Sequence, residues 1–282
     1  MAKLIEGKIV AQKILKNLSE EILYLEKKPS LAVIIVGEDS ASKIYVNLKR
    51  KKAQELGIIS NVIEMPETTS EQELLHKIEQ LNNDADVNAI LVQMPLPQHI
   101  NSTKVIEKIH PLKDVDCFHP YNIGRIATGN KPYVYPCTPK GIIRLLEYYD
   151  IKIEGRNVVV VGRSNIVGKP LSQMLLNENA TVTICHSKTQ NLSSYTQKAD
   201  ILISAAGVRG LITKDMVKDG AVVVDVGMNK NEEGKLCGDV DFSELNEKVS
   251  FITPVPGGVG PMTICSLMQN TVDLYKIQSN TI

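Results

Sequence analysis

Apolar and polar positions follow two different periods along the first part of the chain. Apolar side chains recur every three or four positions over residues 8–28, which predicts an amphipathic helix that stops before Pro29. The apolar run at 31–36 predicts a buried strand, and the next helical pattern, over 40–56, closes at Gly57. The chain therefore begins as an alternation of helix and strand.

The alternation continues with a strand, a helix and a strand at 58–65, 70–81 and 87–93. Ser70 and Glu73 are spaced as a capping box at the start of that helix. Strands that alternate with helices are typical of a parallel sheet covered by helices.

Residues 110–137 interrupt this pattern. They contain four prolines and two glycines, which predicts functional loops at a domain boundary. Thr138 and Pro139 then predict the N-cap and the first position of a helix that runs to about residue 149.

A second series of strands and helices fills the rest of the chain. Its strands are expected at 158–161, 180–185, 199–204, 221–226 and 249–252, with helices at 168–179 and 263–277. The predicted fold class is α/β, with two α/β domains around a cleft and a Rossmann-like second domain. The first domain is expected to comprise 1–137 and the C-terminal helix 264–282, and the second 138–263.

Composition narrows the function. The chain has 32 basic and 32 acidic side chains, which argues against a surface built for nucleic acid or an anionic membrane. No apolar run approaches the roughly 20 residues of a membrane-spanning helix, and the first eight residues contain no apolar signal core. The five cysteines form no CxxC and the five histidines no HxxxH, so no metal site is expected. The same cysteine usage predicts a reducing, cytoplasmic location.

A glycine turn follows the strand predicted at 158–161. Gly162 and Gly168 enclose a turn that leads into the next helix. Glycine lets the backbone approach a pyrophosphate, and a helix N-terminus offers free N–H groups and a partial positive charge. The spacing departs from the full GxGxxG pattern, so a turn without a ligand is the alternative.

The next strand ends without the carboxylate that NAD-binding proteins place there to hold the ribose. His186, Ser187 and Lys188 follow instead. A basic, hydroxyl-rich strand end suits a 2′-phosphate, and Arg163 can pair with phosphate or stack on adenine. NADP is therefore predicted over NAD, the alternative for Lys188 being an ordinary surface lysine.

Four residues of the first half could carry catalysis or substrate binding. Tyr45 and Lys49 lie four positions apart on one face of a predicted helix, where a lysine can donate or accept a proton. Gln93 ends a strand just before two prolines, and Asp116 could bind a polar heterocycle through paired N–H groups. Each also has an ordinary interpretation, as a surface lysine, a strand terminus or a turn-forming aspartate.

The segment 253–263 holds three prolines and three glycines between a strand and a helix. Such a loop is stiff at its prolines and lets a ligand approach the backbone at its glycines. It is predicted to hold a ligand between the domains.

Taken together, these segments resemble the bacterial bifunctional methylenetetrahydrofolate dehydrogenase/methenyltetrahydrofolate cyclohydrolases, the FolD family. The resemblance covers nearly the whole chain, and its specificity comes from the order and spacing of segments that are weak alone. The matching segments are 42–51, 92–97, 113–116, 118–124, 161–170, 186–189, 225–227, 238–241 and 256–263.

The resemblance implies two consecutive reactions in one-carbon metabolism. A hydride would pass from 5,10-methylenetetrahydrofolate to NADP, and water would then open the methenyl cation to 10-formyltetrahydrofolate. By the same resemblance, Lys49 is the catalytic lysine and Gln93 orients it. Tyr45 would stack on the folate ring system, and Asp116 would anchor the pterin.

The resemblance also implies a cofactor site and a homodimer. The residues expected to contact NADP are Gly162, Arg163, Ser164, Ser187 and the backbone of Met228. Pro256, Gly257 and Gly258 would contact the substrate as well as the cofactor.

The chain departs from the family pattern at three positions. Cys117 stands where the family usually has glycine after Asp-Val-Asp, and it would distort the loop of Asp116 if that position needs a positive φ. Met94 replaces leucine and Met228 replaces isoleucine, with little expected effect.

Other classes of protein fit less well. A short-chain dehydrogenase would carry its Tyr-x-x-x-Lys pair after the nucleotide fold rather than more than a hundred residues before it. A dehydrogenase of carboxylic or amino acids would need substrate motifs that this chain lacks, and an NADP sensor has no need of Lys49 with Gln93. A monofunctional cyclohydrolase, or another NADP-dependent dehydrogenase of the same architecture, is the alternative function.

Overall fold

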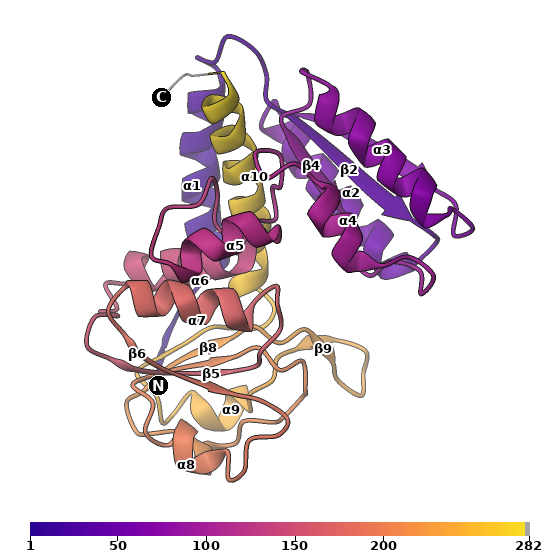
Figure 1. Cartoon of the computed structure of the whole chain (residues 1–282). Helices are drawn as coiled ribbons and strands as arrows, with labels where there is room; N and C mark the ends of the chain where they lie inside the picture. Colours follow the sequence, from indigo (N-terminus) through magenta and orange to yellow (C-terminus); the bar gives the residue numbers. More distant parts are fainter. Residues whose placement is uncertain (280–282) are drawn as a thin grey trace. The chain divides into compact units, whose positions relative to one another are not determined.

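The computed structural model describes residues 1–279, which form two compact units (Figure 1). The three-stranded unit consists of Ile14–Tyr135 and residues 264–279. The six-stranded unit consists of Met1–Lys13 and Pro136–Thr263. Both sheets are parallel and both units carry helices, which confirms the predicted pair of α/β domains.

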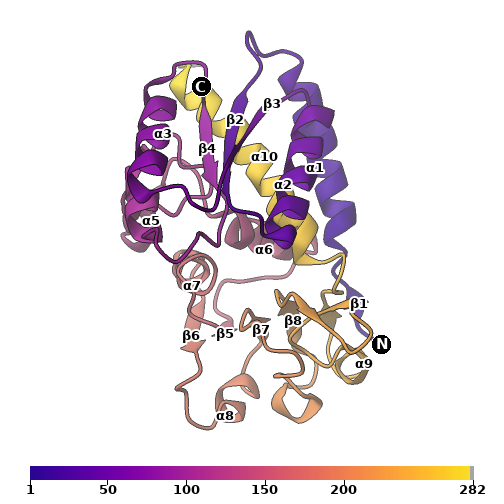
Figure 2. The ribbon, with the colours of Figure 1, turned by 90° about the vertical axis from the view of Figure 1, so that its right-hand side faces the viewer.

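The three-stranded unit has the strand order β3-β2-β4. Its strands are β2 (Ser30–Val36), β3 (Ile59–Met65) and β4 (Ala89–Val92). All seven residues of β2 are buried, as expected for a central strand covered on both faces. Ala32, Ile34 and Val36 share one hydrophobic cluster with apolar residues of α3 and α4, and Figure 2 shows α2 on the other side of the sheet.

The helices that lie wholly within this unit are α2 (Ser40–Glu55), α3 (Glu71–Asn83), α4 (Ser102–Lys108) and α5 (Pro120–Ala127). The capping box at Ser70 and Glu73 is confirmed, since each side chain accepts a hydrogen bond from the backbone of the other. Helix α5 lies in the segment that was predicted to be loop. His119 caps it and Pro120 occupies its first turn, so the proline begins a helix rather than breaking one.

Two helices continue from one unit into the other. Helix α1 (Gly7–Ile22) ends well before Pro29, so the predicted extension of this helix to residue 28 is wrong. Helix α10 (Val259–Gln278) begins four residues before the predicted start at 263.

The six-stranded sheet has the order β1-β11-β8-β7-β5-β6, and every neighbouring pair is parallel. Its strands are β1 (Lys3–Leu4), β5 (Asn157–Val161), β6 (Thr181–Cys185), β7 (Ile201–Ser204), β8 (Val222–Asp225) and β11 (Phe251–Ile252). Because β1 pairs with β11, residues 1–13 pack in this unit, although the prediction assigned them to the first domain.

The remaining elements of this unit are α6 (Cys137–Tyr148), α7 (Gly168–Asn177), α8 (Ser193–Thr196), the 3₁₀ helix Lys214–Met216, α9 (Phe242–Leu245) and the strand pair β9 (Asn229–Lys230) and β10 (Leu236–Cys237). Figure 1 shows α6 and α7 on one face of the sheet and α8 and α9 on the other. The predicted N-cap at Thr138 is wrong. Helix α6 begins at Cys137, two residues before the predicted start at Pro139, and the Thr138 hydroxyl lies 3.0 Å from that of Thr263.

Strand β5 lies between β6 and β7. The chain runs from β5 to its neighbour β6 on one side and then crosses back to β7 on the other side of β5. This is a topological switch point, where open α/β sheets bind ligands at the carboxyl ends of their strands. The Rossmann-like character of the second domain is thereby confirmed.

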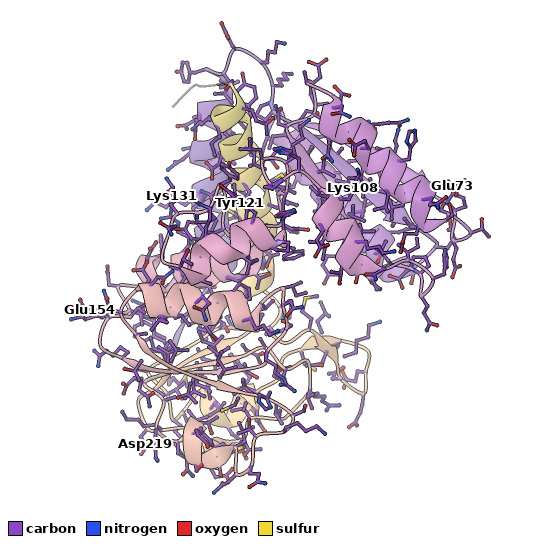
Figure 3. All side chains as sticks on the ribbon, in the orientation of Figure 1. Glu73, Lys108, Tyr121, Lys131, Glu154 and Asp219 are labelled. Atoms are coloured by element: carbon purple, nitrogen blue, oxygen red, sulfur yellow. The ribbon has the colours of Figure 1, made fainter. Side chains whose placement is uncertain are left out.

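Charged side chains cover the exterior of both units, and Glu73, Lys131, Glu154 and Asp219 are exposed examples (Figure 3). Within residues 1–279, no helix is long and apolar enough to cross a membrane. In the same residues, no group of three His, Cys, Asp or Glu side chains is placed to hold a metal ion.

Candidate functional site

The turn after β5 packs its backbone closely against neighbouring backbone. Gly162 has φ +131°, and a Cβ at this position would overlap the carbonyl oxygen of Ala205. A Cβ at Gly168 would in turn overlap the carbonyl of Gly162. Only glycine fits either position, so the predicted glycine turn is built by close backbone packing.

Ser164 fixes the start of α7. Its Oγ accepts hydrogen bonds from the backbone N–H groups of Val167, at 3.1 Å, and Gly168, at 3.4 Å. The helix N-terminus therefore directs its partial positive charge toward the turn. Lys169 donates its N–H to the carbonyl of Ser164 at 3.1 Å and Pro170 has no N–H, so what favours an anionic ligand here is the helix dipole rather than free N–H groups.

The other candidate cofactor residues leave the sheet at the same edge. The last residues of β5 and β6, Val161 and Cys185, are paired, so Arg163 and Ser187 lie two residues beyond adjacent strand ends. Both side chains are exposed. Residues 186–199, which follow β6, contain no Asp or Glu. A ligand at this edge would meet the guanidinium of Arg163, the hydroxyl of Ser187 and the amine of Lys188.

Met228 follows β8, whose last residue Asp225 pairs with Ser204 at the end of β7. Its side chain is 55% exposed. The carboxyl ends of β6, β5, β7 and β8 therefore form one row. Candidate cofactor residues follow β6, β5 and β8, and the loop that packs on the Gly162 turn follows β7.

The loop with Pro256, Gly257 and Gly258 is held by the start of α1. Lys8 donates its backbone N–H to the carbonyl of Gly257 at 3.0 Å, and a Cβ at Gly7 would overlap the carbonyl of Gly258. Gly257 has φ +109°. The loop is thus fixed at its glycines within the six-stranded unit.

In the three-stranded unit, Lys49 and Gln93 are brought together. The Nζ of Lys49, on α2, donates to the Oε1 of Gln93 at 2.9 Å. Gln93 follows β4 directly, and its Nε2 donates to the carbonyl of Met94 at 2.6 Å. Both polar ends of the amide are engaged, so the side chain is fixed with its oxygen toward the lysine.

Tyr45 lies one turn before Lys49 on α2, and both side chains are half-buried. Burial raises the pKa of the Tyr45 hydroxyl, which therefore stays neutral and leaves the ring as an apolar face. Asp116 is also half-buried. Its segment forms a parallel bridge to β4 between Asp114 and Ile90, so Asp116 extends toward the same strand end as Gln93.

Sequence reasoning missed Asp114. This side chain is 2% exposed and accepts hydrogen bonds from the N–H groups of Phe118 and His119 and from the amide of Asn122. Burial raises its pKa from 3.8 to about 6. Asp114 therefore holds the backbone of this loop in shape, and no pattern in its neighbouring residues, which include His110, Pro111 and Lys113, indicated that role.

A buried asparagine on α10 was also missed. Asn270 is fully buried, and its Nδ2 donates to the carbonyls of Val115 at 2.9 Å and Tyr135 at 2.8 Å. It ties together the two ends of the proline-rich segment that carries Asp116. Ser266 and Thr271 of the same helix are also fully buried, so the sequence did not single out this amide.

The predicted requirement at residue 117 is confirmed. Cys117 is fully buried and has φ +60°, a left-handed conformation that L residues other than Asn and Asp adopt rarely. The loop keeps this conformation with cysteine in place, so Cys117 strains its backbone. All five cysteines are free thiols.

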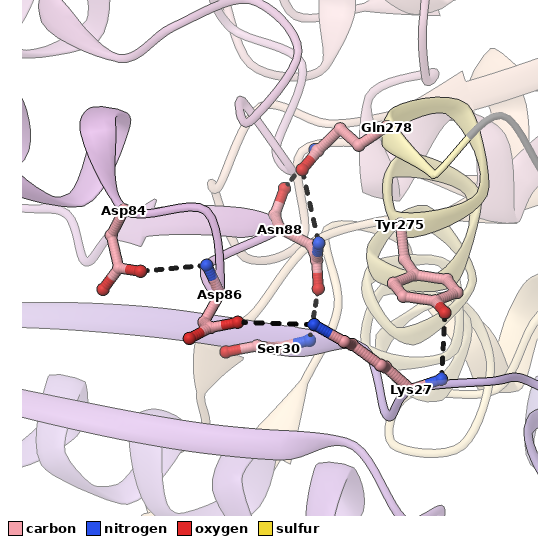
Figure 4. Close-up of polar contacts among 7 residues, drawn as sticks. All are labelled: Lys27, Ser30, Asp84, Asp86, Asn88, Tyr275 and Gln278. Atoms are coloured by element: carbon pink, nitrogen blue, oxygen red, sulfur yellow. Dashed lines mark hydrogen bonds and ion pairs between the residues drawn. The ribbon is translucent and has the colours of Figure 1, made fainter.

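A cavity of about 700 Å³ opens at the other end of the three-stranded sheet (Figure 4). The Oδ1 of Asn88 accepts from the N–H of Ser30, and its Nδ2 donates to Gln278. The Tyr275 hydroxyl accepts from the N–H of Lys27. These groups lie at the amino ends of β2 and β4, so the cavity lies apart from Lys49 and Gln93.

One unit of the chain has a Rossmann-like sheet with a glycine turn at its switch point, and the other holds a lysine and an amide together. These features define a two-domain NAD(P)-dependent dehydrogenase. Comparison with known proteins makes the class more specific. Residues 5–116 match the catalytic domain of tetrahydrofolate dehydrogenase/cyclohydrolase, and residues 136–279 match its NAD(P)-binding domain. The chain belongs to the tetrahydrofolate dehydrogenase/cyclohydrolase family.

Individual relatives extend over the whole chain. The bifunctional protein FolD of Bacillus anthracis is 53% identical over 279 residues, covering 98% of this chain and 97% of the relative. The crystal structure of bifunctional FolD from Campylobacter jejuni has a TM-score of 0.97 and 48% identity, with all of both chains covered. The FolD of Trypanosoma brucei, solved with NADP and an inhibitor, has a TM-score of 0.94 and 38% identity, covering 99% of this chain and 98% of that one.

Proposed function

We propose that this chain oxidises 5,10-methylenetetrahydrofolate with NADP and then hydrolyses the methenyl product to 10-formyltetrahydrofolate. The 2.9 Å hydrogen bond from Lys49 to Gln93 carries the proposal, because it fixes an amine beside a strand end in a chain that has both family domains. The chain thereby serves one-carbon metabolism.

The hydrolytic step needs a group that moves a proton. Water that adds to the methenyl cation must lose a proton, and ring opening must return one to nitrogen. Lys49 can do both through its Nζ when it cycles between amine and ammonium. Gln93 supports this role because its oxygen accepts from Nζ in either state while its Nε2 is held by the Met94 carbonyl.

The folate ring system is assigned to Tyr45 and Asp116. Tyr45 offers a neutral aromatic face for stacking. Asp116 offers a carboxylate that can accept paired N–H bonds from the pterin. Pro256, Gly257 and Gly258 contact the substrate and the cofactor in the same proposal.

NADP fits the row of strand ends in the six-stranded unit. When bound, it accepts the hydride from the methylene carbon. Gly162 and Ser164 would hold the pyrophosphate at the start of α7, and Arg163 and Ser187 would hold the 2′-phosphate, with Met228 contributing its backbone. The Trypanosoma brucei relative was solved with NADP, which supports this choice.

Two further proposals follow from the family. The chain works as a homodimer, like most members. Its five free thiols suit a reducing cytoplasm.

One experiment tests both activities. Purified protein is mixed with 5,10-methylenetetrahydrofolate and NADP, then with NAD, while reduced nicotinamide and methenyl absorbance are followed together. Wild type should reduce NADP with only transient methenyl. Lys49→Ala should let methenyl accumulate, with hydrolysis slowed about 10²- to 10⁴-fold. Gln93→Leu, which removes the acceptor, should slow it less.

Lys51→Ala is the matched control, because Lys51 is an exposed lysine on the same helix. It should behave as wild type. Hydrolysis of methenyltetrahydrofolate supplied as the substrate in a separate trial, without reduction of either nucleotide in the first, would indicate the alternative, a monofunctional cyclohydrolase. Unchanged hydrolysis in Lys49→Ala would remove Lys49 from the mechanism.

A further inference from the structure

Two buried carboxylates lie between the strand ends of the six-stranded unit. Asp225 ends β8 and is 2% exposed, whereas Asp239 follows β10 and is fully buried. Neither side chain faces a basic residue in a salt bridge among the described residues, so backbone and neutral donors satisfy both. Burial of this kind costs free energy unless the hydrogen bonds are well formed.

Asp239 joins three segments. Its Oδ2 accepts from the hydroxyl of Ser204 at 3.0 Å and from the N–H groups of Ala206 at 2.8 Å and Gly207 at 3.1 Å. Its Oδ1 accepts from the Nδ2 of Asn229 at 2.9 Å. The end of β7, the loop after β7 and the start of β9 are therefore held by one side chain.

Asp225 in turn holds Asp239. Its carboxylate accepts from the N–H groups of Asp239 at 2.9 Å and Val240 at 3.1 Å, and also from that of Gly227 at 2.9 Å. Two glycines make room for the pair, since a Cβ at Gly227 would overlap Asp239 and a Cβ at Gly238 would overlap Asp225. The two aspartates and two glycines form one packed unit.

This unit reaches the cofactor turn through the loop after β7. The carbonyl of Ala205 lies where a Cβ of Gly162 would be, so the loop and the turn are in direct backbone contact. Ala205 donates its N–H to Val161 at 2.7 Å, and the next two N–H groups go to Asp239. On its other side Asp239 holds Asn229, the neighbour of Met228.

We propose that Asp239 is a positioning residue for NADP: held by Asp225, it sets the loop at 205–207 against the Gly162 turn and fixes the backbone beside Met228. The proposal rests on the proposed function, since it deepens the assignment of the cofactor site. Asp239 touches neither ligand in this scheme and acts through the backbone it holds.

The test measures NADP binding directly, by calorimetry, in wild type and Asp239→Asn. An asparagine offers one acceptor and one NH₂ group where four donors converge, so one edge of the side chain is mismatched. The Kd for NADP should rise about tenfold, the expected loss for a hydrogen bond to a charged acceptor. Hydrolysis of methenyltetrahydrofolate, which consumes no NADP, should stay within about twofold of wild type.

Asp200→Asn is the matched control. Asp200 accepts from the N–H of Asn157 and from Lys218 at the amino end of the same sheet. It should lower thermal stability without changing the Kd for NADP. Asn229→Ala keeps the Asp239 charge but removes one donor, and it should weaken NADP binding about threefold. If Asp239→Asn does not fold, this variant tests the positioning role of Asp239 in its place.

The outcomes separate the two proposals. Failure of wild type to bind NADP would contradict the proposed function itself. Wild-type binding with equal Kd values in Asp239→Asn, or a loss of affinity in Asp200→Asn as large as in Asp239→Asn, would overturn the positioning role alone.

Discussion

The region around Lys49 is held by side chains, whereas the region around Gly162 is held by backbone in close contact. In the three-stranded unit, Gln93 fixes Lys49 through its amide, and Asn270 fixes the segment of Asp116 through its own. In the six-stranded unit, Gly162 and Gly168 leave no space for a Cβ. The first region depends on which atoms a side chain presents, and the second on the absence of a side chain.

This difference fits the chemistry of the two ligands. A proton transfer needs one amine at one place, so a hydrogen-bonding partner that holds it is sufficient. A pyrophosphate is bound by several backbone N–H groups at once, so the backbone itself must approach closely. Substitutions should therefore impair the two regions by different physical routes.

The largest effect is expected from Gly162→Ala. An alanine at φ +131° is strained, and its Cβ would displace the Ala205 carbonyl. Affinity for NADP, measured by calorimetry, should fall about 100-fold, whereas cyclohydrolase activity should persist. Gly155→Ala is the control, because Gly155 has φ +72° with nothing within 4 Å of its Cβ position. Equal losses in both variants would mean that strain, not close packing, decides the effect.

The sequence predicts these two regions to different depths. The glycine turn and the strands around it follow from local patterns, because a buried parallel strand followed by glycine and a helix has a recognisable period and composition. The pairing of Lys49 with Gln93 spans 44 positions. No local pattern contains such a distance, and only the family resemblance placed the two residues together.

The supporting residues were hardest to predict. Asn270 and Asp239 each act on backbone groups far along the chain, and a single buried polar residue resembles any other until its partners are known. Helix α5 was missed for a different reason. Its proline was interpreted as a helix breaker, although proline in the first turn is favourable.

Intermediate effects are expected from pH, and they concern both units. Burial raises the pKa of Asp114 and of Asp225 from 3.8 to about 6. The folded chain therefore binds these protons more tightly than the unfolded chain. The stability that each carboxyl group contributes is fully present below pH 3.8 and is lost as the pH rises through 6, and about 1.3 kcal/mol of it for each group is lost between pH 5 and pH 7.

Urea titrations at pH 5 and pH 7 check this prediction. Asp114→Asn cannot titrate at this position, so the loss of unfolding free energy between pH 5 and pH 7 should be smaller in the variant than in wild type. Asp225→Asn should behave likewise. If only one variant showed a smaller change of unfolding free energy between pH 5 and pH 7, only that carboxylate would contribute to the pH dependence. The two units would then differ in this property as well.

The smallest effect concerns backbone strain inside the region that otherwise depends on side chains. Cys117 has φ +60°, which costs an L residue about 1–2 kcal/mol relative to glycine. Comparing Cys117→Gly with Cys117→Ala removes the thiol in both, so the buried sulfur does not enter the difference. The glycine variant should be the more stable in urea by about 1 kcal/mol, after the greater freedom of glycine in the unfolded chain is included. The KM for methylenetetrahydrofolate should also be lower in the glycine variant, because Asp116 precedes this residue. An alanine variant as stable as the glycine one would show that the left-handed backbone here carries no strain, and that the loop of Asp116, like Lys49, is set by side-chain contacts alone.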